Sequence, residues 1–451
     1  MHRCFVLLTL LFCTSVSCAT AASPNVLIFL SDDVGYAEYG LQGSKDVPTP
    51  NIDSIAKNGT RFTQGYVSGP YCSPTRAGLM TGRYQTRFGH EFNSAANKEN
   101  GLSLKETTIA TRFKEIGYST CAVGKWHLGE QPQFRPTARG FDEFYGTLAN
   151  TPFFQPRQFV DSRISPEVRE MSEPGFYSTD AYAARAVDWL EKSKGAGKPW
   201  LLYIPFNAQH APLEAPEKYL ARFSGIQDEK RRIFAAMMSA MDDAVGQVLQ
   251  KVRDLGQEEN TLIWFLADNG GPTPSTTSRN DPLRGFKATT WEGGVRVPFC
   301  VQWKGHLPAG AVYEHPIIQL DILPTSLAAA GVEADPAWKL DGVNLLPFLT
   351  GKDKARPHQS LYWRFGDQMA VRHGDLKLVK ARNGGPEPEL YDLAKDISES
   401  SNLAAAQPGK VGELKDLWDK WNAEQAPPVA EKEPGKKPRK KARAKAAAQA
   451  K

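Results

Sequence analysis

A cysteine at the start of a predicted helix is the first candidate for chemistry in this sequence. It lies in the run Tyr71-Cys72-Ser73-Pro74-Thr75-Arg76-Ala77-Gly78-Leu79-Met80-Thr81-Gly82-Arg83. Ser73 suits the cap of such a helix, Pro74 suits its first position, and Gly82 suits its end. Because unpaired N–H groups at a helix start stabilise negative charge, Cys72 is placed for chemistry on an anion.

Two oxygen-rich doublets are the second candidate. Asp32-Asp33 and Asp268-Asn269 each come directly after a strongly apolar run. Carboxylate and amide oxygens suit a hard divalent cation, and Ca²⁺ accepts irregular oxygen cages more readily than Mg²⁺ does. A single Asp-Asp pair is more often a turn or a helix cap, but two doublets in matching positions favour a metal site.

Four basic residues complete the set of candidates. Lys125 and His127 stand two apart in Gly124-Lys125-Trp126-His127, and an extended loop would point both side chains the same way. Lysine binds oxyanions and histidine transfers protons near neutral pH, although a surface lysine beside a core-edge histidine is the plainer interpretation. The role of His210 is equally ambiguous. The sequence position of Lys287, taken alone, indicates a solvated lysine.

Four apolar runs must position these residues, because each run ends in one of the polar loops. They are Val26 to Leu30, Ser119 to Val123, Leu201 to Phe206 and Thr261 to Leu266. Continuous apolar strands are typical of parallel sheets covered by helices on both faces. Ligands bind beyond the carboxyl ends of such strands, so the four loops can converge on one site.

Helical segments alternate with these strands, which predicts an α/β fold with a large, mostly parallel sheet. The expected helices are Leu104 to Ile116, Asp180 to Lys194 and Glu229 to Leu255. Four short strands then predict a smaller C-terminal antiparallel sheet, followed by a helix from about Gly409 to Asn422. The strands are Ser360 to Trp363, Met369 to Arg372, Leu376 to Val379 and Glu389 to Asp392. We therefore divide the chain into residues 23–350, 351–426 and a tail at 427–451.

The N-terminus predicts export. A basic start, an apolar core from Val6 to Phe12 and the small residues Ala19-Thr20-Ala21 indicate a signal peptide over residues 1–22. Its apolar run is too short to span a bilayer, so no transmembrane segment is expected. Ser15 stands where a lipobox requires a large aliphatic residue, which argues against lipoprotein anchoring at Cys18.

Charge and cysteine content narrow the function further. From Glu431 onward the chain has nine Lys and Arg against two Glu, so the formal charge of +5 leaves about −2 for the rest. The folded body therefore lacks the charge of a nucleic-acid binder. The basic tail is expected to be a solvated, disordered segment, with contact to an anionic glycan or cell surface as the alternative. With Cys4, Cys13 and Cys18 in the leader, three cysteines remain, which argues against a disulfide framework. Cys121 and Cys300 lie in apolar runs and are expected to be inert core thiols.

The candidates together suit cleavage of an ester at a tetrahedral anion. A metal and lysines neutralise an oxyanion, and a histidine protonates the leaving group. A cysteine-dependent phosphatase requires an arginine six residues after its cysteine, and that position holds Gly78. The arginine here is Arg76, four residues after Cys72.

This spacing resembles the Cys-x-Pro-x-Arg signature of the type I, formylglycine-dependent sulfatases, arylsulfatase-like members of the alkaline-phosphatase-like superfamily. The resemblance continues through Arg83 and extends from Asn25 to about Asn402. It implies that a maturation enzyme oxidises Cys72 to formylglycine, whose hydrated aldehyde is the nucleophile. It also implies one Ca²⁺, with the ligands Asp32, Asp33, residue 72, Asp268 and Asn269.

The resemblance implies roles for the other candidates as well. Arg76 would hold the diol, and Lys125 and Lys287 would bind the sulfate oxygens. His127 would assist turnover of the hydroxyls, and His210 would bind sulfate and protonate the leaving alcohol. One position departs from the pattern, because Asn150 stands where some relatives place a sulfate-contacting serine. The departure concerns substrate preference rather than reaction type.

The resulting hypothesis is a hydrolase that removes sulfate from a sulfated sugar or glycan in the periplasm or outside the cell. A phosphonate monoester or phosphodiester hydrolase of the same superfamily is the first alternative. A noncatalytic glycan-binding homologue, in which Cys72 is never oxidised, is the second.

Overall fold

The computed structural model describes residues 23–429. The predicted signal peptide with Cys4, Cys13 and Cys18, and the basic tail beyond Val429, lie outside the described residues. No helix within the described range is both long and apolar enough to cross a membrane.

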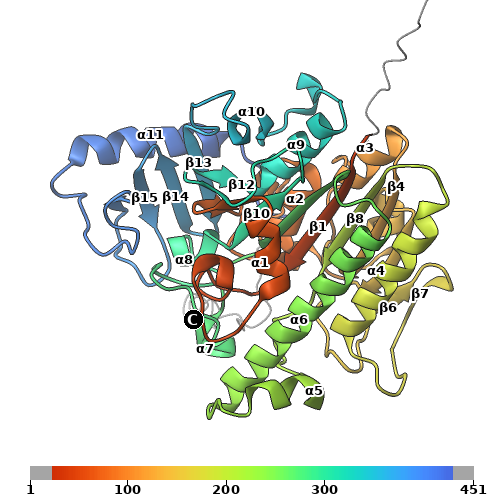
Figure 1. Ribbon diagram of the computed structural model, residues 1–451. Coiled ribbons are helices and arrows are strands. Elements are labelled where there is room, and N and C mark those ends of the chain that lie inside the picture. Colours follow the sequence, from red (N-terminus) through yellow and green to blue (C-terminus); the bar gives the residue numbers. More distant parts are fainter. Residues whose placement is uncertain (1–22, 430–451) are drawn as a thin grey trace, which may run out of the picture.

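A ten-stranded, mostly parallel sheet forms the centre of the molecule (Figure 1). Its strands are β1 (Asn25–Ser31), β2 (Thr60–Phe62), β4 (Ser119–Lys125), β5 (Glu143–Thr147), β6 (Phe159–Asp161), β7 (Ser165–Arg169), β8 (Trp200–Pro205), β9 (Thr261–Ala267), β10 (Phe299–Gln302) and β11 (Ala311–Tyr313). They follow the order β11-β2-β10-β9-β1-β8-β4-β5-β6-β7. The short strands β3 (Gly65–Tyr66) and β12 (Ile317–Ile318) pair separately.

The four predicted apolar strands are neighbours at the middle of this sheet. β9, β1, β8 and β4 pair in parallel, in that order. Every residue of β1, β8 and β9 is buried. Each fully buried Leu, Ile or Phe contributes roughly 1.5–3 kcal/mol relative to an exposed one, so these runs specify the core. The predicted fold class is confirmed.

Helices cover both faces of the sheet. They are α1 (Pro50–Lys57), α2 (Cys72–Thr81), α3 (Ile109–Glu115), α4 (Ser178–Lys194), α5 (Glu217–Leu220), α6 (Glu229–Asp254), α7 (Thr273–Thr276), α8 (Glu292–Val295), α9 (Ile322–Ala329), α10 (Leu346–Leu349) and α11 (Pro408–Ala423). Helices α1, α4 and α6 pack together on one face, and α2, α3 and α9 lie on the other. Helix α3 begins at Ile109 rather than at Leu104, because the Thr108 side chain caps it by accepting the Thr111 N–H.

The C-terminal unit is a four-stranded antiparallel sheet of β13 (Ser360–Phe365), β14 (Gln368–His373), β15 (Leu376–Lys380) and β16 (Glu389–Asp392). The helix predicted to follow these strands is α11, and it packs against the sheet (Figure 1). A fully buried charge cluster ties this sheet to the main body, since the Lys377 ammonium lies 2.8 Å from Glu292 and 2.9 Å from Glu399. Lys377 and Glu399 belong to the C-terminal unit, whereas Glu292 opens α8 in the main body.

Candidate active site

The carboxyl ends of the four central strands meet at one edge of the sheet, and their loops are hydrogen-bonded to one another. The Asp32 N–H donates to the Ala208 carbonyl at 2.8 Å, which joins the loop after β1 to the loop after β8. The Asp268 N–H donates to the Ser31 carbonyl at 3.0 Å, which joins β9 to β1. The predicted convergence of the loops is therefore present in the structure.

Helix α2 begins at Cys72, but Ser73 does not cap it. Tyr71 occupies the N-cap position in an extended conformation. The Ser73 hydroxyl instead lies 2.6 Å from His90 Nε2, and its N–H donates to Asn93 Oδ1 at 3.0 Å. The expectation for Ser73 was wrong, because side chains distant in sequence replace a local cap. Gly82 ends the helix in the left-handed conformation, with φ 65°, as expected.

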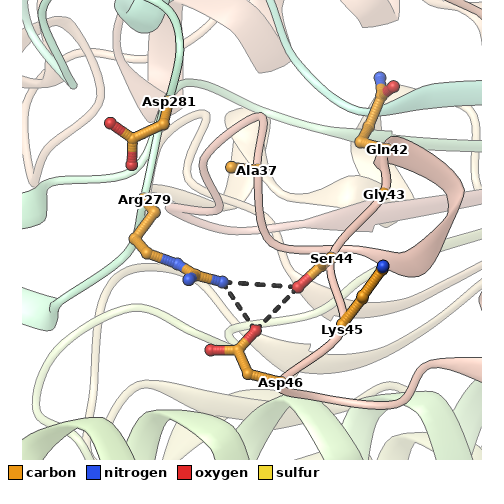
Figure 2. A pocket seen from close by; sticks show the side chains of 8 residues that line it. All are labelled: Ala37, Gln42, Gly43, Ser44, Lys45, Asp46, Arg279 and Asp281. Atoms are coloured by element: carbon orange, nitrogen blue, oxygen red, sulfur yellow. Dashed lines mark hydrogen bonds and ion pairs between the residues drawn. The ribbon is translucent and has the colours of Figure 1, made fainter.

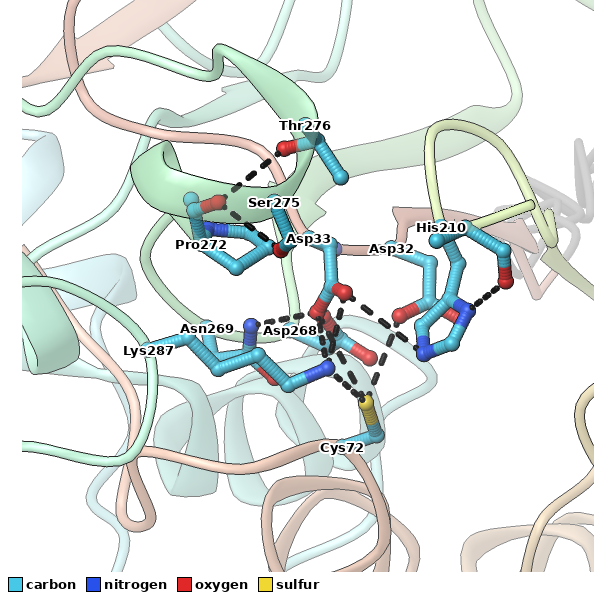
Figure 3. A network of polar contacts seen from close by, with 12 residues as sticks. Asp32, Asp33, Cys72, His210, Asp268, Asn269, Pro272, Ser275, Thr276 and Lys287 are labelled. Atoms are coloured by element: carbon cyan, nitrogen blue, oxygen red, sulfur yellow. Dashed lines mark hydrogen bonds and ion pairs between the residues drawn. The ribbon is translucent and has the colours of Figure 1, made fainter. Parts of the chain in front are cut away.

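The Cys72 thiol lies among charged groups and is fully buried (Figure 3). Its Sγ is 3.4 Å from Asp32 Oδ1, 3.8 Å from Asp33 Oδ1 and 3.3 Å from Lys287 Nζ. Burial, assisted by the charge of Asp32, raises the pKa of the Cys72 thiol well above its ordinary value. The thiol is therefore neutral and is a poor nucleophile as it stands.

Asp33 and Asn269 form the oxygen-rich part of the site. Asp33 has φ 64°, a backbone conformation that costs about 1–3 kcal/mol in a non-glycine residue and is typical of functional sites. Asn269 Nδ2 donates to Asp33 Oδ1 at 2.9 Å. Asn269 Oδ1 is buried and has no hydrogen-bond partner between residues 23 and 429. An oxygen left unpaired beside carboxylates is what a bound cation would satisfy.

The donor set also fits a cation in its spacing. One possible ligand atom from each of Asp32, Asp33, Cys72 and His210 lies within 4.8 Å of the others. Asp268 adjoins them, because its Oδ1 accepts the Asp33 N–H at 3.2 Å. These groups are mainly carboxylate and amide oxygens, which suits Ca²⁺ better than a soft metal.

The loop that follows Asp33 packs against residues 278 and 279. The Gly35 N–H donates to Ser278 Oγ at 2.9 Å, and a Cβ at Gly35 would meet the Arg279 carbonyl oxygen at 2.0 Å, so only glycine fits there. Around the nearby surface hollow of about 350 Å³, Arg279 donates to Asp46 Oδ1 at 2.7 Å (Figure 2). The predicted site residues do not line this hollow, whose arginine is already paired.

Arg76 lies beneath the carboxylates and is fully buried. It donates to Asp268 Oδ2 at 2.8 Å from Nη2 and to the Lys125 carbonyl at 2.8 Å from Nη1, and Nη2 lies 3.3 Å from Asp32 Oδ2. Its hydrogen bonds therefore fix the carboxylates and β4. The expected contact with residue 72 is not among them.

Lys125 is the last residue of β4 rather than part of a loop, and it is completely buried. Its ammonium forms a close ion pair with Asp32. Burial opposes ionisation of Asp32, but the charges of Lys125 and the neighbouring cations outweigh it and hold the pKa of Asp32 far below its ordinary value. The plainer interpretation, a surface lysine, is therefore wrong.

Two histidines face the same group of charges. His127 has φ 58°, so the loop after β4 is not extended, and its Nδ1 is buried without a partner within the described chain. Burial and the charge of Lys125 lower the pKa of His127 well below its ordinary value. His210 Nε2 lies 3.6 Å from Asp33 Oδ2, and burial lowers the pKa of His210 as well. Both imidazoles are therefore neutral near pH 7.

Lys287 is not the solvated lysine that its position alone suggested. Its side chain is 11% exposed, and its ammonium lies 2.6 Å from Asp33 Oδ1. Burial opposes the charge, but the Asp33 carboxylate raises the pKa of Lys287 well above its ordinary value, so Lys287 stays cationic.

The loop that carries Lys287 is hydrogen-bonded to the C-terminal unit. These contacts could not be predicted from the sequence. Gln368 Nε2 donates to the Ala288 carbonyl at 3.0 Å. Arg284 Nη1 donates to Tyr391 Oη and to the Glu399 carbonyl, both at 2.9 Å, and its guanidinium lies 3.7 Å above the Trp291 ring. These partners lie about a hundred residues apart in sequence, and no local motif connects them.

Of the candidate site residues named from the sequence, Cys72 and nine others come together, and Asn150 does not. The ten are Asp32, Asp33, Cys72, Arg76, Lys125, His127, His210, Asp268, Asn269 and Lys287. Asn150 is exposed and lines a separate hollow beyond β5.

Comparisons with known proteins agree with this geometry. Residues 24–332 match the family model "Sulfatase", and residues 286–424 match "N-sulphoglucosamine sulphohydrolase, C-terminal". The chain is 31% identical to arylsulfatase G of Rattus norvegicus, covering 86% of this chain and 84% of the relative. It is 33% identical to N-acetylgalactosamine-6-sulfatase of Canis lupus familiaris, covering 78% and 71%. A crystal structure of Ps i-CgsB in complex with k-i-k-neocarrahexaose superposes with a TM-score of 0.84 and 33% identity, covering 91% of this chain and 95% of that one.

Proposed function

The chain belongs to the sulfatase family, within the alkaline-phosphatase-like superfamily, and from that premise we propose that it removes sulfate from a sulfated carbohydrate by means of an oxidised Cys72 and a divalent cation. The proposal depends mainly on the charged groups around Cys72 Sγ. The carboxylates of Asp32 and Asp33 lie within 3.8 Å of it, and the Lys287 ammonium lies at 3.3 Å. Fixed charges at this position stabilise the negative charge that develops when a nucleophile attacks a bound sulfate.

We propose Ca²⁺ as the cation, held by Asp32, Asp33, residue 72, Asp268 and Asn269. The unpaired Oδ1 of Asn269 and the crowding of carboxylates support this assignment. When bound, the ion neutralises negative charge that develops on the reacting oxygens. Arg76 donates a hydrogen bond to Asp268 and forms an ion pair with Asp32, so helix α2 helps to hold both proposed ligands in place.

Cys72 is proposed as a precursor rather than as the nucleophile. Its thiol is neutral and buried, and the Cys-x-Pro-x-Arg signature supports oxidation to formylglycine by a maturation enzyme. A hydrated aldehyde supplies one hydroxyl to attack sulfur and a second to expel the sulfate. Neither step uses the thiol of Cys72, which is lost when the residue is oxidised to formylglycine.

The remaining side chains would bind the sulfate and move protons. Lys125, which is paired with Asp32, and Lys287, whose Nζ lies 3.3 Å from Cys72 Sγ, are buried cations that can each hold a sulfate oxygen. Neutral His127, with its unpaired Nδ1, can accept a proton from the attacking hydroxyl. The S–O bond to the sugar then breaks, and the departing oxygen takes a proton from His210 in its protonated form.

The substrate class is proposed from the named relatives. Two of them are named for a sulfated sugar or were solved with an oligosaccharide. We propose that the enzyme acts on a sulfated glycan after export directed by residues 1–22, and that the folded domains correspond to residues 23–350 and 351–426.

The test compares turnover of a sulfate monoester with turnover of a phosphodiester, using protein produced together with a formylglycine-generating enzyme. We expect sulfate ester hydrolysis that disappears in a folded Cys72→Ala variant. A strong preference for the diester would instead support the phosphonate or phosphodiester alternative. Glycan binding without turnover by the oxidised protein would support the noncatalytic alternative.

A further inference from the structure

A second hollow lies next to the site, beyond the carboxyl end of β5. It has a volume of about 620 Å³, and we call it the β7 hollow because it lies between residues 150–158 and strand β7. It is lined by two arginines and one glutamate, Arg157, Arg169 and Glu170, so its charge is net positive, and by Asn150, Pro152, Gln158 and Val168. None of the proposed catalytic or metal-binding residues lines it.

The β7 hollow is connected to the site through a short stretch of backbone. The His127 N–H donates to the Leu148 carbonyl at 3.0 Å, and the Leu148 N–H donates to the Gln158 carbonyl at 3.1 Å. Asn150 follows Leu148 by two residues, which span at most about 7 Å. The loop after β5 therefore links the hollow to the backbone of His127, on the β5 side of the site.

Its two arginines are available to a ligand. The Arg157 side chain is 75% exposed, and its Nε lies 3.7 Å from an equally exposed Glu170, a weak type of pair. The Arg169 side chain forms no ion pair or hydrogen bond with any residue of the described range. A guanidinium offers two parallel N–H groups, the geometry that sulfate and carboxylate oxygens accept.

The rest of the lining suits a sugar ring. Asn150 and Gln158 present amide groups, and Gln158 uses only its Nε2, which donates to Glu130 at 2.7 Å. Pro152 and Val168 add apolar surface, and Val168 is 39% exposed. Polar groups that fix orientation beside apolar walls are typical of small-ligand sites, and the volume is within their usual range of about 300–1,000 Å³.

We propose that the β7 hollow is a subsite for a second anionic group, sulfate or carboxylate, on a sugar next to the one being desulfated, with Arg157 and Arg169 as its ligands. The proposal rests on the proposed function and specifies its substrate as a glycan with more than one anionic group. The hollow beside His210, lined by Ala211, Leu213, Lys230 and Glu229, has a balanced charge and does not favour an anion.

The test uses dextran sulfate oligosaccharide as an inhibitor of para-nitrophenyl sulfate turnover. For each variant, the inhibition constant of dextran sulfate is divided by the Michaelis constant for the para-nitrophenyl ester. In Arg157→Gln/Arg169→Gln we expect this ratio to rise about tenfold, or about 1.4 kcal/mol. The matched control is Arg253→Gln/Lys304→Gln, which removes the same charge near Glu258, before the amino end of β9. We expect the control to keep the wild-type ratio.

Two results would overturn the subsite: an unchanged ratio in the Arg157/Arg169 variant, or an equal rise in the control. Failure of the proposed function is a separate result, namely no hydrolysis of any sulfate ester by the oxidised, Ca²⁺-loaded wild-type protein. In that case the subsite is tested by calorimetry, which compares the affinity of dextran sulfate for Cys72→Ala with its affinity for the same variant carrying both arginine substitutions. We expect the same tenfold weakening, and equal affinities would refute it.

Discussion

Arg284 provides a test of whether the C-terminal sheet positions Lys287, the lysine proposed to bind sulfate. Its guanidinium donates to Tyr391 and to the Glu399 carbonyl at 2.9 Å, and it lies 3.7 Å above Trp291, on the loop that carries Lys287. Arg284→Met keeps the apolar stem and removes these contacts. Each hydrogen bond contributes about 0.5–1.5 kcal/mol, so the two bonds to the C-terminal unit hold the loop with roughly 1–3 kcal/mol.

The expected consequence is a catalytic defect larger than the loss of stability alone would produce. A displacement of about 1 Å in a group that binds the reacting anion costs on the order of 100-fold, so we expect kcat/KM for a sulfate ester to fall about 10- to 100-fold. Thermal unfolding monitored by circular dichroism would report the accompanying decrease in Tm.

Arg356→Met is the matched control. Arg356 makes two hydrogen bonds of 3.0 Å to Asp375 within the C-terminal unit, is similarly exposed, and does not touch the Lys287 loop. We expect it to lower the Tm while kcat/KM stays within about twofold of wild type. If Arg284→Met lowered the Tm but kept wild-type kcat/KM, the idea that the C-terminal sheet positions Lys287 would be wrong.

Three further outcomes follow from the site. Removing Ca²⁺ with a chelator should abolish turnover and lower the Tm, because a ligand at 100 times its Kd adds about 2.7 kcal/mol to stability; a Tm insensitive to Ca²⁺ would contradict the metal assignment. Asp268→Asn, which keeps an acceptor for Arg76, should fold but lose both the Ca²⁺-dependent Tm shift and activity. Because burial lowers the pKa of His210 and the acid form is the one required, kcat/KM should decrease as pH rises through a midpoint below about 6.5, and His210→Ala should lose this limb of the pH profile.

The fold was largely predictable, because its signals are local and strong. The four central strands are continuous apolar runs, and the loops that end them carry the polar doublets, so the adjacency of Asp32 and Asp268 follows from parallel pairing. The C-terminal strands could be read from their short, turn-separated pattern.

What the sequence did not reveal depends on long-range contacts. Ser73 has the right type for a cap, but His90 and Asn93 occupy its hydroxyl and its N–H. Lys287 looked solvated because its partners Asp33 and Cys72 lie more than 200 residues away. The left-handed conformation of His127 likewise comes from tertiary packing, since no glycine or turn pair marks it.

The most direct test of the proposed mechanism is the mass of the tryptic peptide from Phe62 to Arg76, measured on an active preparation. We predict that residue 72 has exchanged its thiol for an aldehyde, with the corresponding decrease in mass, and that specific activity is proportional to the converted fraction. Full activity in a preparation whose peptide retains the unmodified Cys72 thiol would contradict the mechanism.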